Sequence, residues 1–248
     1  YKDDTWGWDF WNNDKSPRDD YGHGTHTAGT IGAQGNNGKG VAGVCWNVKL
    51  VGLKIGSRTG SVSTTAAISA INYCVNKGIM LSNHSWGGGG YSSALNTAIT
   101  NARSAGHLLI CAAGNGGSDG IGDNNDAAPF YPASYTHDNI ISVAATDNND
   151  ARASFSNYGA TSVDVGAPGV NIASTYIQQN KNNIYVYNSG TSMAAPHVTG
   201  VAALVWMQNP SWTYSQVRSK ILSTTRPVSS LSGRCVTGGV VNANNAVR

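Results

Sequence analysis

Apolar positions along the chain fall into two kinds of segment that follow one another in turn. Short continuous apolar runs are typical of buried strands, and they cover residues 48–55, 79–82, 107–113, 140–145 and 240–241. Longer stretches with apolar positions three and four apart are typical of helices, and they cover residues 64–76, 93–104 and 214–223 and begin again at His23 and Ser192. Strands that alternate with helices predict a mainly parallel sheet, whose ligands gather at the carboxyl ends of the strands. We therefore expect an α/β fold.

Composition narrows the classes of protein that this fold could serve. The 248 residues fit one large domain. The net charge is +3 and only 12% of the residues are charged, so nothing in the electrostatics favours nucleic acid or an anionic membrane surface as a partner. No apolar run approaches the length of a membrane span, and no internal repeat is present. We expect neither a nucleic-acid nor a membrane partner.

Four cysteines leave the redox compartment open. Cys45, Cys74, Cys111 and Cys235 could form two disulfides through three different pairings. Cys111 lies inside an apolar run, which favours a buried thiol over half of a disulfide.

Ser192 stands where a loop becomes an apolar helix, with small residues on both sides. A serine in this position most often caps the helix and does nothing more. A hydroxyl acts as a nucleophile only when a base takes its proton and a donor stabilises the oxyanion that forms. His23, at the start of a predicted helix, is a candidate base, and Asn115, at the end of a predicted strand, is a candidate donor.

His23 and His26 are three residues apart, a spacing that also occurs in zinc sites. The glutamate of the metalloprotease helix is absent and no third ligand is evident. The sequence therefore does not favour zinc.

Three motifs resemble the subtilisin family of serine peptidases, and the resemblance extends over nearly the whole chain from about Trp6. They are Gly-His-Gly-Thr-His at 22–26, Ala-Ala-Gly-Asn at 112–115 and Gly-Thr-Ser-Met-Ala-Ala-Pro-His at 190–197. The resemblance implies a three-layer subtilisin-like fold with a mainly parallel central sheet flanked by helices. It makes Ser192 the nucleophile, His23 the general base and Asn115 the oxyanion donor, and it leaves His26 as a packing residue.

The same resemblance implies where an extended polypeptide substrate would lie. The residues that would flank it or line its primary pocket are Gly60, Ser61, Val62, Ser85, Trp86, Gly87, Ala112, Ala113 and Gly114. Gly116 stands where several relatives carry an acid, so we expect an apolar or aromatic primary side chain rather than a basic one. Phe130 either closes the base of this pocket or packs against the sheet. Asn83 fits a glycosylation acceptor, but a sugar there would block the cleft.

Calcium is the cofactor that the resemblance suggests, in a structural role and not in catalysis. The acidic loop before His23 matches one calcium loop of some relatives at Asp9, Asn12 and Asp14, although a solvated acidic loop explains it equally well. A second loop matches through Gln34, Asn37, Lys39 and Val41.

The third member of the expected catalytic triad is not evident. In this family the catalytic residues follow one another along the chain as aspartate, histidine and serine, with roughly thirty residues between the aspartate and the histidine. Only 22 residues precede His23, and Asp4 in Asp-Thr-Trp-Gly is too close to it, with Trp6 breaking the pattern. We interpret residues 1–248 as a single peptidase domain that lacks the N-terminal segment with the catalytic aspartate and is impaired alone. The lost segment should also contribute a strand near the middle of the sheet.

The sequence thus favours a secreted, monomeric serine endopeptidase that acts on extended polypeptides through an acyl-enzyme and that has its own propeptide as a further partner. The alternative is an impaired relative or fragment that binds peptides along the same cleft without cleaving them. An α/β-hydrolase esterase needs Gly two residues after the serine and its histidine last. Here Ala194 stands at that position and His23 precedes Ser192, so the esterase is disfavoured.

Overall fold

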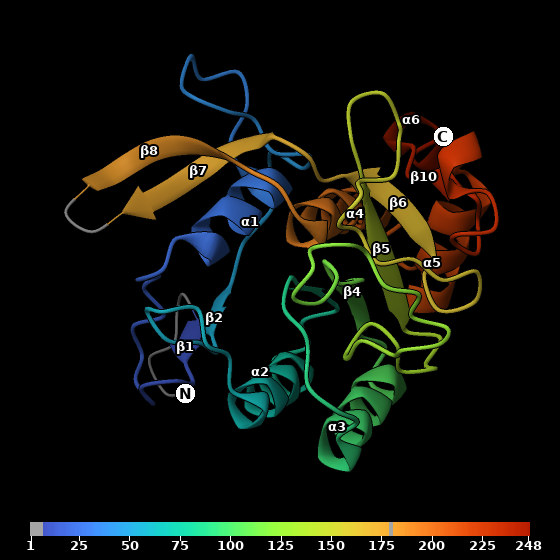
Figure 1. Ribbon diagram of the computed structural model, residues 1–248. Helices are drawn as coiled ribbons and strands as arrows, with labels where there is room; N and C mark the ends of the chain where they lie inside the picture. Colours follow the sequence, from blue (N-terminus) through green and yellow to red (C-terminus); the bar gives the residue numbers. More distant parts are fainter. Residues whose placement is uncertain (1–6, 179–180) are drawn as a thin grey trace.

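A six-stranded sheet forms the centre of the protein in the computed structural model, which describes residues 7–178 and 181–248 (Figure 1). Its strands, in spatial order, are β3 (Leu81–His84), β4 (Leu108–Ala112), β5 (Ile140–Thr146), β6 (Val165–Pro168), β10 (Gly239–Val240) and β9 (Arg226–Pro227). All neighbouring strands are parallel except β10 and β9. The parallel strands β3 to β6 therefore end at the same edge of the sheet.

Helices cover both faces of this sheet. The helices are α1 (His23–Gly32), α2 (Thr64–Asn76), α3 (Ser93–Ser104), α4 (Thr191–Gln208), α5 (Tyr214–Ser223) and α6 (Ala243–Ala246), and a short 3-10 helix spans Ser229–Leu231. Alternate residues of β4 face opposite ways, as in any strand. Leu108 and Ile110 pack against α4 and α5, whereas Leu109 and Cys111 pack against α2 and α3. The expected three-layer α/β fold is confirmed.

Two smaller strand pairs lie outside the six-stranded sheet. β1 (Gly7–Asp9) pairs with β2 (Gly52–Lys54) in parallel, and β7 (Ile172–Gln178) pairs with β8 (Lys181–Asn188) as an antiparallel hairpin. Figure 1 shows this hairpin reaching away from the sheet, with α1 beside it. The contact with α1 is polar: Nε2 of His26 bonds to the carbonyl of Ile172 at 3.0 Å, and Ser174 Oγ donates to the carbonyl of His26 at 2.7 Å.

Three predicted helices have the bounds that the sequence indicated, because each begins at a side-chain cap. Ser63 and Ser92 accept a backbone N–H at the starts of α2 and α3, and Thr213 forms a capping box with Gln216 at the start of α5. Prediction of a strand over residues 48–55 was wrong in extent, since only Gly52–Lys54 pair. Leu50 and Val51 are 41% and 42% exposed, and so they are not the buried run that their apolarity suggested.

The expected additional strand stays a prediction. Within residues 7–178 and 181–248, β2 belongs to the pair with β1, and β3 is an edge strand of the larger sheet. Met80, immediately before β3, is 46% exposed. Asp4 and Trp6, the residues weighed as part of a catalytic motif, lie outside the described residues.

All four cysteines are buried free thiols, so the two disulfides that the sequence left open are not formed. Cys111 is fully buried within β4, as its apolar surroundings predicted, and burial raises the pKa of its thiol. Burial also raises the pKa of the Cys74 thiol, to about 12. These cysteines act as small core residues.

A buried network of two histidines and one serine joins β3 to β4. Ser82 Oγ lies 2.7 Å from Nε2 of His84 and 2.6 Å from Nε2 of His107, and Nδ1 of His107 lies 2.6 Å from the carbonyl of Ile79. That carbonyl only accepts, so His107 carries its proton on Nδ1, and its Nε2 accepts the single proton of Ser82. His84 must then donate from Nε2, which leaves its Nδ1 as an unprotonated acceptor.

This assignment agrees with the surroundings of His84. Its Nδ1 is buried and has no hydrogen-bond partner within the described parts of the chain. A proton added there would create a buried cation without an acceptor. Burial, with a smaller effect of His107, accordingly lowers the pKa of His84 to about 3. The hydrogen bonds of this network thus require that the rings of His84 and His107 are both neutral.

Acid should therefore destabilise the fold through His84. The unfolded chain takes up a proton near the ordinary histidine pKa of 6.5, whereas the folded state resists protonation until the pKa of about 3. We expect the free energy of unfolding to fall by ~1 kcal/mol per pH unit between these limits, in addition to what carboxylates contribute. Urea unfolding at a series of pH values measures this slope. His84→Gln, which keeps a donor near Ser82 but does not titrate, should flatten it, and equal slopes would contradict the assignment.

Candidate active site

Ser192 is the second residue of α4 and not its cap. The N-cap is Gly190, which supplies no side chain, and Ser192 Oγ donates instead to the carbonyl of Ser85 at 3.1 Å. Ser85 Oγ donates in return to the carbonyl of Ser192 at 2.7 Å. Ser192 therefore does not cap the helix, and its hydroxyl lies beside the segment that follows β3.

A chain of side-chain bonds fixes the strand end that receives Ser192. Asn83 donates from Nδ2 to Ser85 Oγ at 2.8 Å, and Thr199 of α4 donates to Oδ1 of Asn83 at 3.0 Å. Both polar atoms of the Asn83 amide thus bond inside the protein, which disfavours glycosylation there.

Asn115 follows β4 and lies against the start of α4. Its Oδ1 accepts the backbone N–H of Thr191 at 2.8 Å and the Thr191 hydroxyl at 2.9 Å. Because Oδ1 accepts both bonds, Nδ2 is directed away from Thr191 and keeps its two N–H groups. A Cβ on Gly190 would lie 3.5 Å from Nδ2, so this nitrogen is adjacent to the turn that leads into Ser192. The first N–H groups of a helix have no helical acceptor, and that of Ser192 is among them.

His23 begins α1 and is half-buried. Burial lowers the pKa of its imidazole, the carboxylate of Asp19 raises it and His26 lowers it further. A lowered pKa keeps the ring neutral, as a general base requires. Helices α1 and α4 pack together, yet within the described residues no side chain hydrogen-bonds to the His23 ring, and Ser192 Oγ bonds to Ser85. Catalytic hydrogen bonds often form only when substrate is present.

Tyr21 connects His23 to one of the expected substrate-flanking segments. The Tyr21 and His23 rings have centroids 6.5 Å apart. A Cβ on Gly60, whose φ of +85° already favours glycine, would lie 2.7 Å from Cζ of Tyr21. Beyond Gly60, Ser61 and Val62 are exposed. Tyr21 could not be predicted from the sequence, because its contact is with a loop far along the chain.

The other expected segments follow neighbouring strands. Ser85, Trp86 and Gly87 come directly after β3, and Ala112, Ala113 and Gly114 end β4 and follow it. Since the two strands are parallel neighbours, both segments leave the sheet at the same edge, and we call them the first and the second wall. Sequence analysis missed the two asparagines that hold the second wall. Asn125 donates to the carbonyl of Ala113 at 2.8 Å, and Asn157 donates to Asn125 at 2.9 Å and, through its backbone N–H, to the carbonyl of Gly114 at 2.9 Å.

Phe130 lies between these walls. A Cβ on Gly87 would be 2.7 Å from Cζ of Phe130, and a Cβ on Gly114 would be 3.0 Å from its Cγ. The ring is half-buried and also packs against the hydrophobic cluster beneath α2 and α3. Of the two roles that the sequence left open, Phe130 thus has features of both.

A comparison with protein families gives the relationship of this chain. The model of the subtilase family of peptidases matches residues 1–244. The chain belongs to the subtilase family. The resemblance seen in the three motifs is thereby confirmed.

Individual relatives of this subtilase are named proteases. The chain is 41% identical to subtilisin Savinase of Lederbergia lenta over 233 residues, and this match covers 94% of the chain and 80% of Savinase. It is 42% identical over 242 residues to a thermostable alkaline protease of Halalkalibacterium halodurans, covering 98% of this chain and 62% of that protein. An alkaline protease of Alkalihalobacillus alcalophilus is covered over 57% of its length. The chain thus spans less than two thirds of several relatives that it matches.

Solved structures agree with the fold of this subtilase. A cold-adapted subtilisin-like serine proteinase is 36% identical, with a TM-score of 0.77, over 95% of this chain and 78% of that one. A protease from Pseudoalteromonas arctica is also 36% identical, with a TM-score of 0.78, over 91% of this chain and 70% of that one.

In the first candidate calcium loop of the subtilase, N–H groups of the protein already bond to the carboxylate oxygens that calcium would need. Asp9 is 1% exposed, and its carboxylate accepts the backbone N–H groups of Trp11 and Asn12, each at 2.8 Å. It also accepts the Asn12 side-chain amide at 2.8 Å and lies 3.2 Å from the ammonium of Lys54. Asp14 accepts the backbone N–H of Ser16. With the charge of Asp9 neutralised by Lys54, Asp9, Asn12 and Asp14 do not fit a calcium ion as arranged.

The second candidate loop, with Gln34, Asn37, Lys39 and Val41, contains no carboxylate. Asn37 Oδ1 accepts the backbone N–H of Lys39 at 3.0 Å. Over residues 7–178 and 181–248 no group of three or more acidic, histidine or cysteine side chains could hold a metal. Calcium in this subtilase therefore stays a prediction from the family resemblance.

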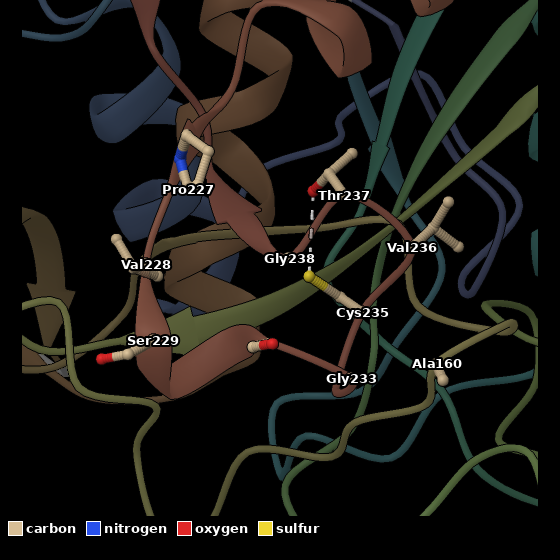
Figure 2. Close-up of a pocket in the computed structure, with 10 residues that line it drawn as sticks. Ala160, Pro227, Val228, Ser229, Gly233, Cys235, Val236, Thr237 and Gly238 are labelled. Atoms are coloured by element: carbon tan, nitrogen blue, oxygen red, sulfur yellow. Dashed lines mark hydrogen bonds between the residues drawn. The ribbon is translucent and has the colours of Figure 1, made fainter.

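The hollow shown in Figure 2 does not belong to the candidate active site. It has a volume of about 610 Å³ and is lined by the C-terminal segment around Cys235 and Thr237, together with Ala160. None of the residues predicted to bind substrate lines it. Separately, among the described residues, none of the helices is both long and apolar enough to span a bilayer.

Proposed function

We propose that this subtilase is a serine endopeptidase that cleaves extended polypeptides through an acyl-enzyme. The observation that carries the proposal is the orientation of Asn115. Its Oδ1 accepts two bonds from Thr191, so its Nδ2 remains a donor beside the turn that presents Ser192. A nucleophile and a preorganised oxyanion donor therefore meet at the carboxyl edge of the sheet.

Each residue has a defined step in this reaction. Ser192 Oγ attacks the scissile carbonyl while His23 takes its proton. The oxyanion accepts hydrogen bonds from Nδ2 of Asn115 and from the backbone N–H of Ser192. The intermediate expels the amine, which receives the proton from His23, and leaves the acyl group on Ser192. Water then hydrolyses the ester with His23 again as the base.

We also propose that His23 needs a carboxylate partner supplied from outside residues 1–248, so that this segment alone is an impaired catalyst. Within the described residues, no carboxylate bonds to the His23 ring, although the charge of Asp19 raises the pKa of that ring. In subtilisin itself, loss of the triad aspartate costs about 3 × 10⁴ in kcat. The order of motifs in the family supports a partner that precedes the histidine.

Substrate would bind by strand addition, in which backbone groups hold the peptide and pockets select its side chains. The exposed loop at Gly60–Val62 and the segment Ser85–Gly87 would lie on either side of it. The partners that fit this surface are polypeptides, with the protein's own propeptide among them. We also propose that the protein is secreted, as the resemblance to the subtilisin family implies; the relatives are named alkaline proteases.

A second function, peptide binding without cleavage, is favoured by one observation. The hydroxyl of Ser192 donates to the carbonyl of Ser85 and not to His23. If that bond persisted with substrate bound, Ser192 would not be activated.

Labelling of Ser192 separates these functions. The natural protein that contains this chain should react with a serine-directed fluorophosphonate and hydrolyse casein, because an activated hydroxyl attacks both. Ser192→Ala should lose both reactions by at least ~10³-fold. Ser189→Ala, an exposed serine three residues away, serves as the control and should keep both. A parent protein that neither labels nor cleaves would leave the peptide-binding function.

Asn115→Leu tests the oxyanion donor. The variant keeps the size of the side chain but removes Nδ2, so kcat for a chromogenic peptide should fall while KM changes little. In subtilisin, removal of the corresponding kind of donor costs about 10²–10³ in kcat, which sets the scale here. A thermal unfolding curve checks that the loss of the Thr191 bonds has not unfolded the protein. A fall of less than twofold in kcat would remove Asn115 from the mechanism.

The primary pocket should accept small apolar side chains better than aromatic ones. Phe130 occupies space between the walls at Gly87 and Gly114, so a long side chain placed there would meet its ring. We therefore narrow the expected apolar or aromatic preference to short apolar side chains.

Phe130→Ala should reverse this preference. Removal of the ring opens the space between the walls, and the ratio of kcat/KM for phenylalanine over alanine at the primary position should rise ~10-fold or more. Phe155→Ala is the control, because Phe155 is also half-buried but packs against the opposite core cluster. An unchanged ratio in Phe130→Ala would assign Phe130 to packing alone.

A further inference from the structure

One carboxylate fastens the loop that leads into α1. Asp19 Oδ1 accepts the backbone N–H groups of Tyr21 at 2.9 Å and Gly22 at 2.8 Å. Its Oδ2 accepts the backbone N–H and the hydroxyl of Thr25, both at 2.7 Å. The four bonds come from residues on both sides of His23, so the carboxylate spans the turn that carries this histidine.

The helix start depends on this carboxylate. The N-cap of α1 is Gly22, in a left-handed backbone conformation, and the first helical turn, which lies within the described residues, has neither a side-chain cap nor an acidic residue. Asp19 therefore satisfies donors that a capping residue would otherwise satisfy. Four donors favour the ionised form, and they lower the pKa of Asp19 although burial opposes them. The bonds thus favour the ionised form of Asp19, whose charge acts on the His23 ring.

We propose that Asp19 is a positioning residue for His23: its carboxylate holds the turn that aims the imidazole, and its charge stabilises the imidazolium that forms during the reaction. The proposal rests on the proposed peptidase function. It assigns Asp19 a part that does not require contact with substrate, since its oxygens face the backbone of the turn and Thr25.

The charges around His23 determine the direction in which loss of Asp19 would shift the pKa of the imidazole. Asp19 on the loop and His26 on α1 act directly on the His23 ring, and the centroid of the Tyr21 ring lies 6.5 Å from that of His23. Beyond these groups, His197 on α4 interacts with His26, and Tyr176 on β7 interacts with Tyr21 and Asp19. In the part of the chain that the structure describes, burial and His26 lower the pKa of His23, and the carboxylate of Asp19 raises it. Removal of the Asp19 charge should lower the pKa of His23 further.

The neighbouring Asp20 provides a matched control. Its carboxylate is 43% exposed and lies 2.8 Å from the ammonium of Lys54, and so it serves the contact with β2. Asp20→Asn removes the same charge from the adjacent position but leaves the four bonds of Asp19 intact.

The test compares Asp19→Asn with Asp20→Asn in the natural protein that contains this chain. Asn keeps an acceptor for Tyr21 and Gly22, but its NH₂ group faces the N–H of Thr25. We expect kcat to fall ~10-fold, with a smaller change in KM, since small displacements of a catalytic group cost this much. The acid limb of the kcat/KM profile should move to lower pH, which a purely structural cap would not cause. Asp20→Asn should show neither change. An acid limb that stays in place with Asp19→Asn overturns the proposal.

Two further measurements separate this proposal from the proposed function. In a Ser192→Ala background, NMR titration of the His23 ring needs no catalysis, and Asp19→Asn should lower the pKa of the ring. An unchanged pKa overturns the proposal even if the protein proves to cleave nothing. If Asp19→Asn does not fold, Thr25→Val removes one of the four bonds and keeps the charge. It should lower kcat by less than Asp19→Asn does, because three of the four bonds remain, and it should leave the acid limb in place. An unchanged kcat in Thr25→Val would then contradict the proposed positioning role of Asp19.

Discussion

The bonds between Asn115 and Thr191 join the end of β4 to the start of α4, and the geometry of the site depends on them. Gly114 adds a third bond, from its backbone N–H to the Thr191 hydroxyl at 3.2 Å. Together with the reciprocal bonds of Ser85 and Ser192, they attach the first turn of α4 to the ends of two neighbouring strands. A nucleophile on a free loop would have to be ordered at each encounter with substrate. Here folding has already ordered Ser192, the proposed nucleophile.

The parallel register of β3 to β6 makes this attachment possible. Leu81 pairs with Leu108 and Leu109 with Ile140, so the strand ends that bear Ser85 and Asn115 reach the same edge of the sheet. The side chains of β4 are buried on both faces, and each fully buried aliphatic side chain contributes ~1.5–3 kcal/mol. The apolar centre of the sheet thereby holds polar loops at fixed positions, although the loops themselves bury little apolar surface.

Much of the fold could be predicted from local sequence, and the limits have a physical cause. α2, α3 and α5 begin at Ser63, Ser92 and Thr213, whose caps are readable within three residues of chain. Ser192, His23 and Asn115 were found because their motifs are specific. Tyr21, Asn125 and Asn157 were missed because their partners lie far along the chain, and an asparagine or tyrosine in a loop has no local signature of its distant contact. The hairpin of β7 and β8 was also missed, since it lies outside the sheet that the apolar runs described.

That hairpin has a mechanical consequence. β7 is bonded to the first turn of α1 through Thr175 and Ser174, which donate to the carbonyls of Thr25 and His26 at 2.8 and 2.7 Å. β8 continues directly into the turn that presents Ser192. The same ribbon is therefore attached to the helix that begins at His23 and continues into the helix that carries Ser192. Two motifs that lie far apart along the chain thus share one structural support.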